Sequence, residues 1–79
     1  MIVGVDIGTS VTKAAGIDRG GRVLTSASRE SVLHHLPGGR VEQDLDGVLG
    51  TVVAVVREVA AQLDEVPEAI AITGQGDGL

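Results

Sequence analysis

The apolar residues of this chain change their spacing once, and that change limits the folds open to it. From residue 45 to residue 63 they recur every three or four positions, the period of an amphipathic helix: Leu45, Val48, Leu49, Val52, Val53, Val56, Val59, Ala60 and Leu63. Asp44 is a good N-cap for this helix, and residues 69–73 (AIAIT) follow as a short apolar strand. A strand reached through a helix normally runs parallel to an earlier strand by a right-handed crossover. The pattern therefore predicts a helix that crosses one face of a sheet.

The first third of the chain predicts the strands that this helix covers. Residues 2–7 (IVGVDI) and 11–17 (VTKAAGI) are apolar runs, and the Asp/Gly-rich residues 18–21 (DRGG) are a strong turn signal before a third strand from residue 22 to about 31. Residues 32–43 contain Pro and Gly without periodicity, which indicates a loop. We therefore expect an α/β fold with a three-strand antiparallel meander, a crossover helix and a parallel strand beside the first.

Composition excludes several classes of function. The 79 residues contain no Phe, Tyr or Trp, so Val, Ile, Leu and Ala must supply the core. A net charge of −5 and scattered basic residues argue against a nucleic-acid partner. There are no cysteines, hence no disulfide framework and no thiolate metal site. The N-terminal apolar run is too short for a signal peptide or a membrane span, so we expect a cytoplasmic protein without a membrane partner.

The first strand is followed by a stretch suited to phosphate binding. Asp6 lies near the end of the first strand, the turn passes through Gly8 beside the hydroxyls of Thr9 and Ser10, and the chain continues to Lys13. A glycine lets the backbone approach a ligand, N–H and hydroxyl groups donate to phosphate oxygens, and a carboxylate can hold a hydrated Mg²⁺. The alternative is an ordinary hairpin turn, which is also rich in Asp, Gly and Ser.

A second loop is expected beside this one. If the last strand runs parallel to the first, the loops after Asp6 and Thr73 lie at the same edge of the sheet. The second loop contains a carboxylate, Asp77, among glycines.

His34 and His35 invite a metal interpretation, but adjacent histidines point in different directions and no third ligand has suitable spacing. We therefore interpret them as loop residues.

Four ordered motifs resemble the N-terminal signature of the FGGY carbohydrate kinases. They read VDIGTSVTK, DRGGRV, LPGGRVEQD and IAITGQGDG in this order along the chain, and the resemblance extends over essentially all 79 residues. Neither a Walker A P-loop nor a Rossmann fingerprint is present. The resemblance implies the N-terminal lobe of a ribonuclease H-like, actin-like ATPase fold. It also implies that this lobe is incomplete, with the remainder of lobe one and all of lobe two absent.

The resemblance assigns roles on the phosphate side. Asp6 matches the aspartate that positions the Mg²⁺ of Mg-ATP, through water. Gly8, Thr9 and Ser10 match the turn that wraps the transferred phosphate. Lys13 matches a basic residue directed at that phosphate, where positive charge would offset the charge that develops during transfer. The alternative for Lys13 is an exposed strand lysine without a catalytic role.

The resemblance also assigns a substrate side. Gln75, Gly76 and Asp77 lie on the segment where relatives hold sugar hydroxyls, and a carboxylate is a good acceptor for them. Gly76 replaces a larger side chain, which leaves room in the pocket. The GQGDG sequence resembles erythritol-type and some pentulose kinases. The alternative for Asp77 is an ordinary Asp-Gly turn.

These features predict a sugar kinase that uses ATP and Mg²⁺ to phosphorylate a hydroxyl of a small sugar or polyol. The full-length protein could form a homodimer. A general base is expected downstream of Leu79, so the chain of residues 1–79 alone is expected to be inactive. One alternative is a truncated, catalytically inactive remnant or interaction module. A third hypothesis, an actin- or chaperone-like ATPase, is disfavoured by the GQGDG loop.

Overall fold

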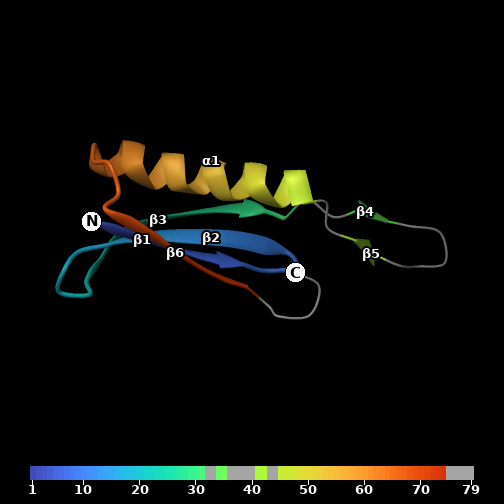
Figure 1. Cartoon of the computed structure of the whole chain (residues 1–79), viewed down its shortest axis with the longest axis horizontal. Coiled ribbons are helices and arrows are strands. Elements are labelled where there is room, and N and C mark those ends of the chain that lie inside the picture. Colours follow the sequence, from blue (N-terminus) through green and yellow to red (C-terminus); the bar gives the residue numbers. More distant parts are fainter. Residues whose placement is uncertain (32–33, 36–40, 43–44, 75–79) are drawn as a thin grey trace.

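A four-stranded sheet carries one long helix on one of its faces (Figure 1). The structure is a computed structural model and describes residues 1–31, 34–35, 41–42 and 45–74. The sheet has the strand order β3-β2-β1-β6. Its elements, with the helix, are β1 (Ile2–Ile7), β2 (Val11–Ile17), β3 (Val23–Glu30), α1 (Leu45–Leu63) and β6 (Ala69–Gly74). β1 pairs antiparallel with β2, β2 antiparallel with β3, and β6 parallel with β1. The meander, crossover helix and parallel strand predicted from the sequence are confirmed.

The turn between β2 and β3 is held by Asp18, as its sequence indicated. The Asp18 carboxylate accepts hydrogen bonds from the backbone N–H groups of Gly20 and Arg22, each at 2.9 Å. The carbonyl of Asp18 also accepts from the N–H of Gly21 at 3.1 Å. Gly21 has a φ of 85°, a conformation that a side chain would strain. The local sequence therefore fixes the hairpin register.

The segment predicted as a loop over residues 32–43 contains a short strand pair, which corrects that prediction. β4 (His34–His35) pairs antiparallel with β5 (Val41–Glu42), with His34 opposite Glu42 and His35 opposite Val41. A ladder of two residues on each side is too short to produce a detectable alternation of apolar and polar residues. The sequence pattern therefore could not reveal it.

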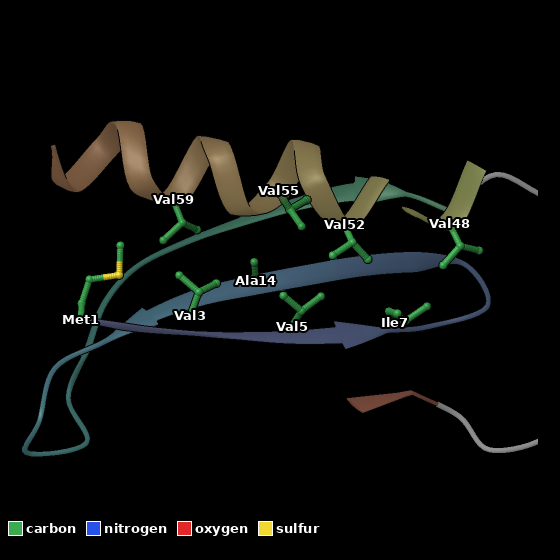
Figure 2. Packing of buried hydrophobic residues seen from close by; sticks show 9 residues of the cluster. All are labelled: Met1, Val3, Val5, Ile7, Ala14, Val48, Val52, Val55 and Val59. Atoms are coloured by element: carbon green, nitrogen blue, oxygen red, sulfur yellow. The ribbon is translucent and has the colours of Figure 1, made fainter. Parts of the chain in front are cut away.

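The core lies between α1 and the covered face of the sheet (Figure 2). Side chains from β1 and β2 point toward the helix, and a row of helix valines points back at them. The buried apolar residues are Met1, Val3, Val5, Ile7, Ala14, Val48, Val52, Val55 and Val59. Burial of this apolar surface is what holds the helix, since its valines and glycines give it a weak intrinsic propensity.

The buried face of α1 is rotated from the predicted one. Thr51 and Val55 are buried although the predicted stripe omitted both, whereas Leu45, Leu49 and Val53 remain 69%, 53% and 46% exposed. Among the described elements, α1 packs on β1, β2 and β3 and does not contact β6. The valines and leucines of α1 spread over roughly half of the helix circumference, which is wider than the buried face, and the period alone therefore left the phase of the helix undetermined. Within the described residues, no helix has the length and apolar content needed to cross a membrane.

The start of β1 is tied to the segment before β6 by Glu68. The α-amino group of Met1 lies 3.3 Å from Glu68 Oε1, and the N–H of Glu68 donates to the Met1 carbonyl at 2.8 Å. Arg19 approaches the other carboxylate oxygen at 3.5 Å. The hydrogen bond from the amino group and the charge of Arg19 lower the pKa of Glu68 below its ordinary value. These contacts bring β6 into register beside β1.

α1 ends in a Schellman motif built around Asp64. The N–H of Glu65 donates to the Ala60 carbonyl at 3.2 Å, and the N–H of Asp64 to the Ala61 carbonyl at 3.3 Å. Asp64 has a φ of 51°, the left-handed conformation that glycine adopts most easily. Here an aspartate occupies the position that glycine usually fills, beside the negative end of the helix dipole.

Replacing Asp64 with glycine is expected to stabilise the protein, because the glycine adopts this conformation without steric cost. The expected gain in the free energy of unfolding is about 0.5–1 kcal/mol, measured by urea denaturation. The Asp64→Ala variant is the control, since it removes the same carboxylate but keeps a Cβ. A difference of roughly 1 kcal/mol between the two variants isolates the backbone effect. Equal stabilities would contradict the assignment of strain to Asp64.

Candidate functional site

Asp6 and Lys13 lie side by side on the sheet face opposite the helix. Along β1 the residues Val3, Val5 and Ile7 are buried, so Asp6, between two of them, faces the other way. The antiparallel register pairs Asp6 directly with Lys13, and both are exposed. Residues paired in this way have Cβ atoms about 4.5–5.5 Å apart. Within the described part of the chain, neither side chain forms a hydrogen bond or an ion pair.

The same register extends this pair into a polar row across the whole sheet. Lys13 pairs with Ser28 of β3, and Asp6 pairs with Thr73 of β6. The neighbouring row holds only small residues, in the order Ser26, Ala15, Gly4 and Ala71. The missing side-chain volume leaves an open groove of about 320 Å³, lined by this second row together with Asp6, Lys13 and Thr73. The carboxylate and the ammonium group therefore border a groove with an apolar floor.

The loop between β1 and β2 closes tightly on Gly8. Its N–H donates to the carbonyl of Val11 at 3.1 Å. A Cβ built on Gly8 would lie 2.6 Å from that same carbonyl oxygen, closer than a carbon atom can approach without moving the backbone. Thr9 and Ser10 are exposed at the tip. The sequence DIGTS thus folds into a turn that excludes a side chain at Gly8 and presents two hydroxyl residues to the outside.

Ser31 donates hydrogen bonds to this loop, and no sequence motif pointed to it. Directly after β3, its N–H donates to the Ser10 carbonyl at 2.9 Å and its hydroxyl donates to the Gly8 carbonyl at 2.7 Å. The hydroxyl of Thr12 lies 3.2 Å from the Ser31 hydroxyl, and Thr12 is only 2% exposed. A single serine after a strand gives no sequence signal, so only the fold reveals this contact.

The ends of β1 and β6 meet at one edge of the sheet, as predicted. The parallel register pairs Ile7 with Gly74, the last residues of the two strands. The predicted substrate residues Gln75, Gly76 and Asp77 follow directly in the sequence and lie outside the described residues. The structure therefore brings Asp6, Lys13 and the Gly8 loop together and fixes the point from which the second loop departs.

The donor set at this edge suits a hydrated cation. The described residues contain no group of three His, Cys, Asp or Glu side chains that could hold a metal ion by themselves. Mg²⁺ does not need a group of three protein ligands, because it keeps several waters and is bound through one or two carboxylates and the substrate phosphates. An exposed Asp6 without a partner among the described residues fits that requirement.

The predicted N-cap Asp44 lies outside the described residues, as do the side chains of His34 and His35.

Comparisons with known proteins agree with this geometry. The sequence model of the FGGY family of carbohydrate kinases, N-terminal domain, matches residues 1–79. The chain is 37% identical over 81 residues to the erythritol kinase of Brucella abortus (strain 2308), covering 99% of this chain and 16% of that protein.

Solved structures show the same fold. A gluconate kinase from Lactobacillus acidophilus superposes with a TM-score of 0.83 at 27% identity, over 94% of this chain and 15% of that one. A xylulose kinase from Rhodospirillum rubrum superposes with a TM-score of 0.79 at 30% identity, over 94% of this chain and 16% of that one. The chain thus spans about one sixth of the length of these relatives.

Proposed function

The chain belongs to the FGGY family of carbohydrate kinases, whose N-terminal domain it matches over its whole length, and we propose that the full-length protein transfers the γ-phosphoryl group of ATP to a hydroxyl of a small polyol. The residues described above supply the phosphate side of this reaction. The general base and the adenine site would belong to other parts of the full-length protein, and we therefore expect the chain of residues 1–79 alone to be inactive.

Asp6 and Lys13 supply opposite charges at the place where a phosphate would bind. The Asp6 carboxylate would hold the hydrated Mg²⁺ of Mg-ATP, an ion that neutralises charge on the phosphate oxygens. Lys13, its cross-strand partner, would place an ammonium group beside the transferred phosphoryl group. The register that pairs the two residues is the single observation that carries this proposal, because one rigid pair of strands then sets the distance between cation and ammonium.

The loop of Gly8, Thr9 and Ser10 would contact the phosphate oxygens. A side chain at Gly8 is excluded by the Val11 carbonyl, so the backbone itself lines the approach. The exposed hydroxyls of Thr9 and Ser10 can both donate to an anion. Donors fixed before the substrate arrives need no reorganisation during transfer.

Gln75, Gly76 and Asp77 would bind the acceptor. Their segment begins where Gly74 pairs with Ile7, at the end of the sheet that also carries the Gly8 loop. The Asp77 carboxylate can accept hydrogen bonds from polyol hydroxyls, and Gly76 leaves space beside it. The 37% identity to an erythritol kinase favours a four-carbon polyol among the candidates.

The proposal is tested with the full-length protein in a coupled assay of ADP release. Tetritols, pentuloses and glycerol are offered in turn as acceptors, with Mg-ATP as donor. We expect ADP release to depend on the acceptor and to be fastest with a tetritol. ATP hydrolysis at one rate with and without every acceptor would instead indicate an actin- or chaperone-like ATPase. No ATP turnover at all would favour an inactive remnant or interaction module.

A further inference from the structure

Two hydroxyl groups and one carbonyl form a directed chain of hydrogen bonds behind the Gly8 loop. The Ser31 hydroxyl carries one proton, which it donates to the Gly8 carbonyl at 2.7 Å. The proton between Ser31 and Thr12, whose oxygens lie 3.2 Å apart, must therefore come from Thr12. Thr12 is 2% exposed, so water does not compete for its hydroxyl, and each bond polarises the next.

This series of hydrogen bonds fixes the orientation of the peptide group between Gly8 and Thr9. The carbonyl of Gly8 and the N–H of Thr9 belong to one planar trans peptide and point in opposite directions. Because the carbonyl is held by Ser31, the Thr9 N–H points away from Ser31. The N–H of Ser31 holds the Ser10 carbonyl in the same way, at 2.9 Å. Both hydrogen bonds turn carbonyl oxygens toward Ser31. Without these bonds the two oxygens could face an anion in the loop and repel it.

We propose that Ser31, supported by Thr12, is a positioning residue that sets the phosphate loop of residues 8–10 in its binding conformation. The inference rests on the proposed function, since it assigns the loop to phosphate. Among the described residues, the hydrogen bonds from Ser31 to the loop go to the carbonyls of Gly8 and Ser10, so Ser31 acts through the loop backbone and not on the substrate. The residue directly after β3 thereby contributes to a site that the sequence placed on the first two strands.

The test compares nucleotide binding by variants of the full-length protein. Ser31→Ala is expected to weaken binding of a non-hydrolysable ATP analogue with Mg²⁺ about tenfold, because the analogue keeps the γ-phosphoryl group that the loop would contact. It should also lower kcat about tenfold, with the KM for the acceptor unchanged. Binding of adenosine, which has no phosphate, should stay at the wild-type value. Ser31→Thr keeps the hydroxyl and should restore affinity for the ATP analogue to within about threefold of the wild type. Thr12→Val should weaken binding of the ATP analogue severalfold.

Thr51→Val is the matched control, because it also removes a hydroxyl-to-carbonyl hydrogen bond, from Thr51 to Gly47 at 2.9 Å within α1. It should leave affinity for the ATP analogue unchanged. Wild-type affinity for the ATP analogue in Ser31→Ala, or an equal loss of adenosine and ATP-analogue binding, would overturn the proposal. If Ser31→Ala does not fold, unchanged affinity for the ATP analogue in Thr12→Val overturns it instead. A wild type that binds the ATP analogue but phosphorylates no acceptor would refute the proposed function while leaving these affinities to decide the role of Ser31.

Discussion

Asp6→Ala is expected to reduce phosphoryl transfer by the full-length protein on the order of a thousandfold while leaving its fold intact. The carboxylate is the proposed anchor for hydrated Mg²⁺, and no described neighbour can replace it, because its cross-strand partner Lys13 is a cation. The fold should tolerate the change, since Asp6 is exposed and forms no hydrogen bond or ion pair among the described residues. The measurements are kcat in the ADP-release assay and the free energy of unfolding in urea.

Asp64→Ala is a suitable comparison for this experiment. It also removes an exposed aspartate, but at the far end of α1, where the expected effect is on stability and not on turnover. Raising the Mg²⁺ concentration should partly restore activity in Asp6→Ala if the lost carboxylate acts through the cation. Wild-type turnover in Asp6→Ala would remove the basis for assigning the cation to this residue.

Gly8→Ala is expected to lower kcat/KM for ATP about a hundredfold, because a misplacement of about 1 Å at a phosphate site costs that much. The added Cβ would stand 2.6 Å from the Val11 carbonyl oxygen, and the obstacle is backbone, not a side chain that can rotate away. The loop must therefore shift. The KM for the acceptor should change less than that for ATP, and both are obtained from the same assay.

Gly50→Ala serves as the control glycine. A Cβ at Gly50 meets nothing within 4 Å, and the residue lies inside α1. We expect a gain in stability of up to about 1 kcal/mol from the higher helix propensity of alanine, with ATP kinetics unchanged. Equal kinetics in the Gly8 and Gly50 variants would show that the close approach at Gly8 has no part in catalysis.

Much of the fold could be predicted because its signals are local. The DRGG turn specifies a hairpin through the side chain of Asp18, and the change of period at Leu45 marks the start of the helix. The parallel pairing of β6 with β1 followed from the rule for crossover connections. The approach of the two strand ends, at Ile7 and Gly74, is a consequence of that topology.

The remaining features depend on tertiary contacts that no local pattern encodes. The phase of α1 is decided by the strands beneath it, which is why Val55 is buried and Leu49 is not. The role inferred for Ser31 depends on β3 ending beside a loop more than twenty residues earlier in the chain. The hairpin that carries Asp6 and Lys13 could be predicted from the sequence, but their direct pairing required the register.

The position of β1 in the sheet also determines the order in which the protein can fold during translation. β1 is synthesised first and becomes a central strand, with β2 on one side and β6 on the other. The β1–β2 hairpin can close early, since few residues separate its strands. The edge of β1 that pairs with β6 stays unpaired until β6 has left the ribosome, and an unpaired central strand is a template for wrong partners. Chaperone binding to nascent chains that end between α1 and β6 is the expected sign of that interval.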